Sequence, residues 1–319
     1  MKLKTLTLLL LTCSFAIAQD YKSIVAKADG FYDNKEYEKS VASYKEAFKI
    51  EQKNPGDLYN AGCSASLSGD KTLAFEWLNL ALENGWANTN HLKTDTDLTA
   101  LHDSKQWTEL LTAMQKEVDK REANYDKPLQ AELVGIFNDD QVIRRQFISA
   151  QKEFGYQSKQ VDSLGKIMMY IDSVNLIKVS KILDKHGWVG ADKIGGQANQ
   201  TLFLIIQHSD LKTQQKYLPM MREAVKNKNA NASALALLED RVALGKGERQ
   251  IYGSQIGRDN ETQKHYVLPL DDPDNVDKRR AEAGLGPLAD YVKSWDIIWN
   301  AEEYKKLLPE LEAKQSKQK

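Results

Sequence analysis

Cysteine is nearly absent from this 319-residue chain, which has only Cys13 and Cys63. The five histidines are scattered without metal-ligand spacing, so we expect no metal site and no cofactor. Cys63 lies among small residues in a helical pattern, which favours a small buried side chain over a nucleophile. The motifs G-x-S-x-G, H-E-x-x-H and G-x-x-x-x-G-K-[ST] are also missing, so no standard motif indicates a reaction.

Neither sign of charge is in large excess, because 44 basic residues face 45 acidic ones. A protein that binds nucleic acid usually carries a clear basic excess, so we expect no nucleic acid partner. A hydrophobic fraction of 41% is enough to bury a core, and the length favours two domains over one.

The segment 1–18, MKLKTLTLLLLTCSFAIA, combines two lysines, a short apolar run and an A-x-A site. This pattern is typical of a secretory signal peptide cleaved after Ala18, and it predicts a periplasmic or secreted protein. A membrane anchor is disfavoured because the apolar run is well short of the roughly 20 residues that a span needs. A lipoprotein would use Cys13, but the preceding Leu-Thr pair makes a poor lipobox.

Internal repetition appears when the chain is aligned with itself at a shift of 34 residues. Five pairs of positions then carry the small and large packing residues of a helix-turn-helix: Ala28 with Gly62, Phe31 with Ala65, Ser40 with Ala74, Tyr44 with Leu78, and Ala47 with Ala81. Over residues 21–86 the chain therefore resembles the tetratricopeptide repeat family. The resemblance implies a concave surface that binds a protein or peptide; alternatively, the repeats only dock onto the C-terminal domain.

After Trp86 the repeat register is lost, and an amphipathic helix is expected from about Ser104. Trp107, Leu110, Leu111 and Met114 have the i, i+3, i+4, i+7 spacing of one buried helix face. We interpret this helix as the cap of a short solenoid covering residues 19–121.

The second half predicts a mainly α domain over residues 127–308 with one β-hairpin, followed by a solvated tail at 309–319. Pro128 is a plausible start for a helix that runs to about Phe154, and Gly187 a plausible stop for the next. The apolar stretch TLFLIIQHSD would fit a buried strand, but its helical neighbours favour a central helix that ends in Gln207 and His208. The hairpin would pair RQIYGSQI with KHYVLPL and place Ile251, Gly253 and Gln255 on one strand face.

Several motifs of this half occur in the same order in an uncharacterised family of bacterial proteins of unknown function. They are NDDQVIRRQ, IDSVNLIKVSKILDKHGW, IGGQANQTLFLIIQHSD, LLEDR, QIYGSQ and DKRRAEAGLGPLADY. The chain resembles this family over about residues 129–292, although Val189 stands where the family usually has proline. The resemblance implies no established activity.

One polar cluster is expected to gather side chains from these motifs around His208. Its other candidates are Gln141, Arg144 or Arg145, Asp172, Asn175, Gln207, Asp240, Arg241, Tyr252, Gln255 and Arg279 or Arg280. In a functional interpretation His208 is a general acid or base, an aspartate orients it, and arginines hold an anionic group. In a structural interpretation the same groups form a satisfied network that fixes helices and hairpin.

Two hypotheses for function follow. In the first, the chain is an exported protein whose repeats bind a protein or peptide, joined to a ligand-binding or scaffold domain. In the second, it is an enzyme of the hydrolase kind that acts on an anionic cell-envelope substrate through His208. Convergence of His208, Arg241 and Gln255 on an open cleft would favour an enzyme or a ligand-binding domain, whereas a sealed and mutually bonded cluster would favour a scaffold.

Overall fold

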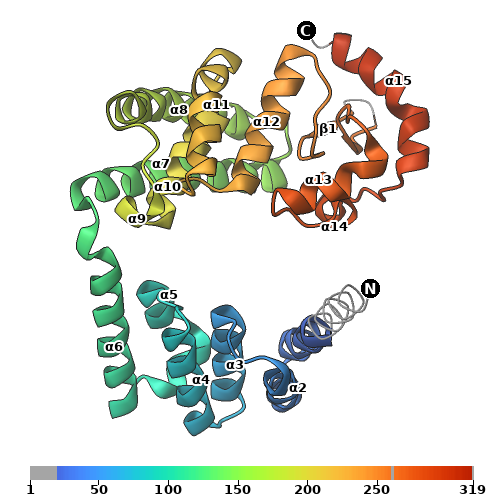
Figure 1. Cartoon of the computed structure of the whole chain (residues 1–319). Helices are drawn as coiled ribbons and strands as arrows, with labels where there is room; N and C mark the ends of the chain where they lie inside the picture. The colour runs from blue at the N-terminus through green and yellow to red at the C-terminus, as the bar shows by residue number, and fades with distance from the viewer. Residues whose placement is uncertain (1–19, 260–261, 318–319) are drawn as a thin grey trace, which may run out of the picture. The chain divides into compact units, whose positions relative to one another are not determined.

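The computed structural model describes residues 20–259 and 262–317, so the expected signal peptide at 1–18 lies outside the described residues. The chain is mainly helical with one small two-stranded antiparallel sheet, which confirms the expected fold class (Figure 1). It divides into two compact units, Met1–Ala123 and Asn124–Lys319. Within the described ranges, no helix combines the length and the apolar character that a membrane span requires.

The N-terminal unit is a series of antiparallel helices joined by short turns. A first helix includes residues 20–33. The elements that follow are α2 (Tyr37–Ile50), α3 (Pro55–Leu67), α4 (Lys71–Glu83), α5 (Thr89–Thr94), η1 (Thr96–Leu101) and α6 (Lys105–Arg121). Side chains of Asn54, Asp70 and Ser104 cap α3, α4 and α6 by accepting hydrogen bonds from first-turn N–H groups.

The packing positions expected from the 34-residue repeat are buried, except that Phe31 is only partly buried. At the repeat position of Gly62 only a small residue fits, because a Cβ atom would lie 2.8 Å from Cγ of Leu78. Helices α3 and α4 can therefore approach closely only because this side chain is missing. The expected face of α6 is buried at Trp107, Leu110 and Met114.

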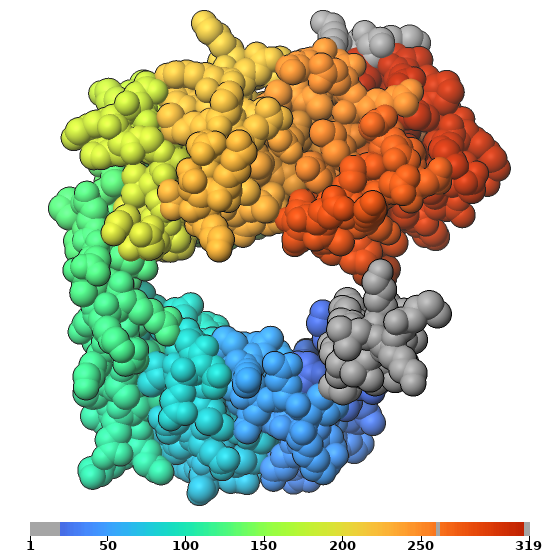
Figure 2. Space-filling model, viewed as in Figure 1, coloured from blue at the N-terminus to red at the C-terminus, as the bar shows by residue number. Residues whose placement is uncertain are grey.

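In the C-terminal unit, long helices come first along the chain and are followed by a small sheet and a final helix. Its helices are α7 (Lys127–Phe154), α8 (Lys159–His186), α9 (Ala191–Ile194), α10 (Gly196–Gln207), α11 (Leu211–Lys226), α12 (Ala232–Lys246), α13 (Val276–Glu282), α14 (Leu288–Val292) and α15 (Ala301–Lys317). Short 3-10 turns cover η2 (Glu122–Asn124), η3 (Pro273–Asn275) and η4 (Lys293–Trp295). The segments from α10 to α15 form one closely packed body (Figure 2).

Helix α10 is the centre of the first half of this unit, because it contacts α7, α8, α9, α11 and α12. Leu202, Phe203, Ile205 and Ile206 are all buried, so the apolar stretch is a helix buried on most sides, as preferred over the strand. His208 directly follows the last residue of α10, and its backbone N–H bonds to the carbonyl of Leu204.

The hairpin exists but is shorter than expected. Strand β1 (Ile256–Arg258) pairs with β2 (His265–Val267) in antiparallel register. Ile251, Gly253 and Gln255 precede β1 and lie in a loop, so they share no strand face. Positive φ at Gly253 (+69°) breaks the extended conformation that the expected strand required.

The expected solvated tail at 309–319 is wrong for most of its length, because α15 continues to Lys317. Tyr304, Leu308 and Leu311 form a buried stripe along α15 against the hairpin and α14. Lys314 also pairs with Asp259 at 3.0 Å. The polar composition of the segment hid Leu311, which continues the helical spacing of Tyr304 and Leu308.

Replacing Gly62 with valine tests the close contact between α3 and α4. The new side chain would press on Leu78, and such overpacking costs about 1–3 kcal/mol of unfolding free energy. Hydrogen exchange should speed up in peptides covering α3 and α4. Gly30→Val is the matched control, since a Cβ atom at Gly30 meets nothing within 4 Å. Equal protection in both variants would contradict the interpretation.

Candidate functional site

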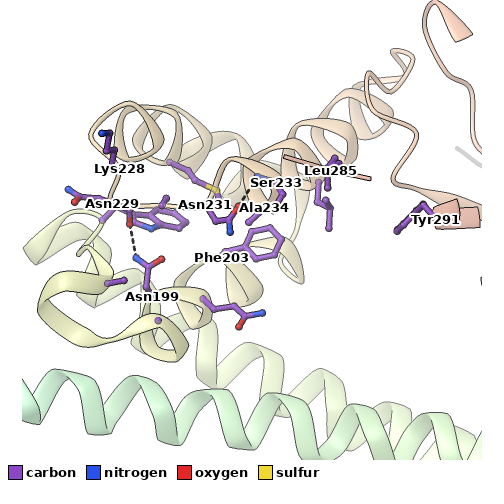
Figure 3. Close-up of a pocket in the computed structure, with 16 residues that line it drawn as sticks. Asn199, Phe203, Lys228, Asn229, Asn231, Ser233, Ala234, Leu285 and Tyr291 are labelled. Carbon is purple, nitrogen blue, oxygen red and sulfur yellow. Dashed lines mark hydrogen bonds between the residues drawn. The ribbon is translucent and has the colours of Figure 1, made fainter. Parts of the chain in front are cut away.

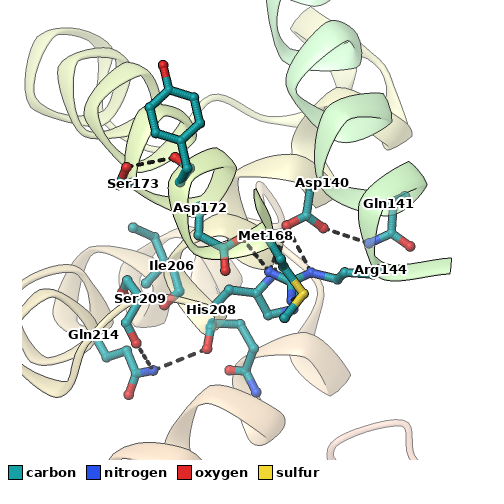
Figure 4. A network of polar contacts seen from close by, with 12 residues as sticks. Asp140, Gln141, Arg144, Met168, Asp172, Ser173, Ile206, His208, Ser209 and Gln214 are labelled. Atoms are coloured by element: carbon teal, nitrogen blue, oxygen red, sulfur yellow. Dashed lines mark hydrogen bonds and ion pairs between the residues drawn. The ribbon is translucent and has the colours of Figure 1, made fainter. Parts of the chain in front are cut away.

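Asp140 is the centre of a polar network between α7, α8 and α10 (Figure 4). Its carboxylate is fully buried. Oδ1 lies 3.0 Å from Nδ1 of His208 and accepts a hydrogen bond from Nε of Arg144 at 3.1 Å. Oδ2 accepts from the Gln141 amide at 2.8 Å. Each oxygen of the buried carboxylate therefore has a donor.

Arg144 carries the network on to α8. Its Nη2 donates to Oδ1 of Asp172 at 2.6 Å, and its Nη1 lies 3.3 Å from the sulfur of Met168. One guanidinium thus joins two carboxylates on different helices, which fixes how α7 and α8 pack.

Burial and hydrogen bonding shift the pKa of Asp140 in opposite directions. Burial alone would raise it, but the hydrogen bonds from His208 and Arg144, together with their charges, outweigh burial and lower the pKa to about 2. The carboxylate is therefore an ionised acceptor that orients the imidazole of His208.

Asp140, Asp172 and His208 offer ligand atoms that all lie within 4.8 Å of one another, as a metal site would require. The Arg144 guanidinium, however, already bonds to both carboxylates. A divalent cation at the same place would meet a fixed positive charge, so these residues are poorly suited to hold a metal.

Two buried amide groups beside this network lack hydrogen-bond partners among the described residues. They are Nδ2 of Asn175, which is 1% exposed, and Oε1 of Gln207, which is 5% exposed. An unsatisfied buried polar group costs about 1–3 kcal/mol. The nearby cavity has a volume of about 90 Å³ and is lined partly by Asp172 and His208. This space is small, so the polar network has little room for a ligand.

Asp240 organises a second network in the loop before β1. Its Oδ1 accepts from the backbone N–H groups of Ile251 (2.6 Å) and Tyr252 (2.9 Å), and its Oδ2 accepts from that of Ser254 (2.9 Å). Burial raises the pKa of this carboxyl, while the three backbone donors favour its ionised form. The carboxylate therefore replaces the strand hydrogen bonds that this loop lacks.

Arginines from α13 hold the other side of the same loop. Arg280, only 2% exposed, donates to the carbonyls of Tyr252 (2.8 Å) and Gly286 (2.6 Å). Arg279 donates to the carbonyl of Ile251 at 2.9 Å. These guanidinium groups are occupied by backbone carbonyls, which gives them a structural role.

The single cluster expected from the sequence is therefore two networks. Asp172 and Gln141 join His208 in the first, whereas Asp240, Tyr252 and Arg280 belong to the second. Among the described residues, no hydrogen bond or ion pair joins His208 to a residue of the second network.

Gln255 adjoins the second network, because its side-chain amide donates to Oγ of Ser254. Arg145 lies outside both networks and is exposed without a hydrogen bond or ion pair in the described chain. Arg241 is also exposed and unpaired there. Partial desolvation by surrounding atoms, followed by repulsion from Arg144, lowers the pKa of its guanidinium. Arg145 and Arg241 are thus the candidate arginines whose donors remain available among the described residues.

Sequence reasoning missed Asp140 and Gln250. Asp140 precedes Arg144 by four positions on a helix, a spacing that favours an ion pair and could have signalled it. Gln250 is fully buried, and its amide bonds to the carbonyls of Gln255 and Leu268. No local pattern distinguishes it from a surface glutamine.

The N-terminal unit contains a separate cavity of about 480 Å³. It is lined by four aspartates and by three tyrosines among others: Asp29, Asp33, Asp95, Asp97, Tyr32, Tyr44 and Tyr59. Each tyrosine hydroxyl donates to one carboxylate: Tyr32 to Asp97, Tyr44 to Asp29 and Tyr59 to Asp95. We call this cavity the acidic groove.

No lysine or arginine lines the acidic groove to neutralise these carboxylates. The nearest basic group is His91, whose Nε2 lies 3.5 Å from Asp95. Cys63 also lines the groove, but burial, followed by the charges of Asp95 and Asp97, raises the pKa of its thiol. The neutral thiol is neither a good nucleophile nor a good metal ligand.

A family model described as a family of unknown function, DUF6624, matches residues 127–301. No curated protein matches the chain. No solved structure matches it either.

The lowered pKa of Asp140 predicts a pH-dependent stability. An unfolded aspartate has a pKa near 4, so the contribution of Asp140 is complete above about pH 4 and lost as the pH falls toward 2. A difference of about two pKa units corresponds to roughly 2–3 kcal/mol. Urea unfolding between pH 2 and 6 should show this slope in the wild type and a flatter one in Asp140→Asn.

The exposed neighbour Asp139 provides the control for this titration. Asp139→Asn should keep the wild-type slope. A slope that is unchanged in Asp140→Asn would show that the buried carboxylate does not favour its ionised form in the folded protein.

Proposed function

This chain belongs to the DUF6624 family, and we propose that it is an exported binding protein whose N-terminal unit captures a basic peptide segment. The acidic groove is the observation that carries this proposal: four aspartates line one cavity without a lysine or arginine. Export is supported by the signal-peptide pattern of residues 1–18.

A tetratricopeptide-like arrangement of the N-terminal helices supports a peptide as the ligand. The groove collects residues from the first helix, α2, α3, α5, η1 and the residue before η1. Repeated helix pairs commonly present such a concave surface to an extended partner. With a volume of about 480 Å³, the groove has room for a few side chains.

The charge of the groove favours lysine or arginine side chains in that peptide. Tyrosine hydroxyls hold Asp29, Asp95 and Asp97 in fixed orientations, so the carboxylates are positioned before a ligand arrives. Tyrosine rings in the lining can also stack against a cation. Exposed ion pairs contribute little individually and are screened by salt, so affinity should depend on several contacts together.

Binding of labelled hexalysine, measured by fluorescence anisotropy, tests the acidic groove. We expect binding that weakens with salt, and little binding of a hexa(Gly-Ser) peptide of equal length. Asp33 is exposed and has no hydrogen-bond or ion-pair partner in the described chain, so Asp33→Asn should spare the fold. Combining it with Asp29→Asn should weaken binding by about tenfold, the equivalent of roughly 1.4 kcal/mol.

The control for charge alone is Asp103→Asn, because Asp103 is exposed and does not line the groove. This variant should bind hexalysine as the wild type does. Equal losses in Asp103→Asn and in the groove variant would show only long-range attraction and would overturn the proposal, as would equal binding of both peptides.

We propose a scaffold role for the polar network of Asp140 and His208 in the C-terminal unit. A hydrolase acting on an anionic cell-envelope substrate is the second candidate, because Asp140 orients His208 as a general base would require and Arg241 is unpaired. Against it, the adjoining cavity of about 90 Å³ offers space for a few water molecules rather than a substrate.

Replacing His208 with alanine separates the two candidates. A scaffold role predicts a loss of about 1.5–3 kcal/mol, since Asp140 keeps its charge but loses one donor. The N-terminal unit should stay protease-resistant and should bind hexalysine normally. In a thermal-shift screen of cell-envelope metabolites and phosphorylated compounds, a ligand that stabilises the wild type but not His208→Ala would instead favour the hydrolase.

A further inference from the structure

The C-terminal unit contains a larger cavity, of about 740 Å³, apart from the network of Asp140; it adjoins the second network at Tyr291, whose hydroxyl donates to the carbonyl of Ser254. It lies between α10, α11 and α12 and the loops beside them, with Leu285 and Tyr291 at one side. None of Asp140, Asp172 and His208 lines it. Its volume falls within the range of about 300–1,000 Å³ that small-molecule sites occupy.

The walls of this cavity are mainly apolar. Phe203, Met221, Ala234, Leu237 and Leu285 supply aliphatic and aromatic surface. An apolar wall of this extent, open to a ligand, favours an apolar body in the occupant.

Among the residues that the structure describes, Lys228 is the only charged one that lines the cavity, and no carboxylate does. It is exposed, and in the described chain its ammonium has no ion pair or hydrogen bond. It lies in the turn between α11 and α12, where its backbone has a φ of +60°. The cavity therefore has one available cation and nothing acidic to neutralise it.

Trp188 adds aromatic surface to the wall of the cavity. It is only 7% exposed, and its indole Nε1, which has no hydrogen-bond acceptor within the described residues, is closed off from the accessible space. The indole N–H therefore does not reach the cavity, and the charge of Lys228 is what indicates the polar group of the occupant.

The labelled residues of the cavity are spread along its length (Figure 3). Lys228 and Tyr291 lie at opposite ends of the row, with Phe203 and Ala234 between them. From the single cation and the apolar walls, we propose that this cavity binds an elongated apolar molecule carrying one carboxylate. The carboxylate pairs with Lys228, and the apolar body lies along Phe203 toward Tyr291.

Calorimetric titration of the full chain with dodecanoate, below its micellar concentration, tests this assignment. One site per chain is expected, and dodecan-1-ol should bind about tenfold more weakly because it cannot form the charge-assisted contact. 2-Naphthoate and dodecanoate each carry one carboxylate on an apolar body. Comparing their affinities therefore shows whether the cavity prefers an aromatic or an alkyl body. Binding of either acid in preference to its neutral alcohol supports the proposal.

Three variants locate the binding. Lys228→Met should weaken dodecanoate binding about tenfold without affecting dodecan-1-ol, whereas Lys226→Met, outside the cavity lining, should change neither. Ala234→Trp should fill the cavity and abolish binding, with helical circular dichroism confirming that the chain is folded.

The proposal is overturned if neither acid binds at millimolar concentration, or if acid and alcohol bind equally well. It is also overturned if a folded Ala234→Trp variant retains wild-type affinity, because the ligand would then occupy another place. None of these outcomes bears on hexalysine binding by the acidic groove, so each proposal can be contradicted without affecting the other.

Discussion

Burial of two carboxylates is the constraint on which the C-terminal unit depends. An ionised group removed from water is tolerated only when donors surround it. Asp140 obtains its donors from α7 and α10, and Asp240 obtains its donors from the loop that precedes β1. Neither carboxylate can be satisfied until these segments have packed, so the two residues favour one arrangement of helices and loop over other compact ones.

The same constraint distinguishes the arginines. Arg280 donates hydrogen bonds to backbone carbonyls of the loop, and Arg144 forms ion pairs with two carboxylates. Arg241 has neither kind of partner among the described residues. The polar candidates in the family motifs therefore do not form one pocket and chiefly secure the packing. Other residues of four of these motifs, among them Trp188, Phe203, Leu237 and Tyr291, line the large cavity.

Much of the fold could be predicted from the sequence, because helices leave local signals. Pro128 begins α7 within its first turn, and Gly187 ends α8 at a φ of +68°. The hairpin was also predictable, but its length was not. Alternating residues suggested that the strand included Ile251 and Gly253, whereas Asp240, on another element, holds their segment as a loop. Side-chain bonds between distant segments decide such boundaries, and sequence periodicity does not reveal them.

The site was partly predictable for a related reason. Asp140 stands in the stripe formed by Leu133, Ile136 and Ile143, and Asn175 stands four residues before buried Val179. A polar residue in a core stripe must be buried, so periodicity could have identified both. It could not have supplied their partners. Whether Asp140 bonds to His208 and whether Asn175 lacks an acceptor depend on the rotation and depth of α10, which follow from the packing of the whole unit.

Net charge describes this protein poorly because opposite charges are separated within it. A formal charge of −1 suggested no nucleic acid partner, and it does not reveal that one cavity gathers aspartates without a lysine or arginine while another has a lysine without a carboxylate. Attraction between exposed charges falls off over roughly 8–10 Å at physiological salt, so each cavity presents its own local potential to a ligand. Ligands of opposite charge can therefore be selected by one nearly neutral chain, and the composition alone excludes neither.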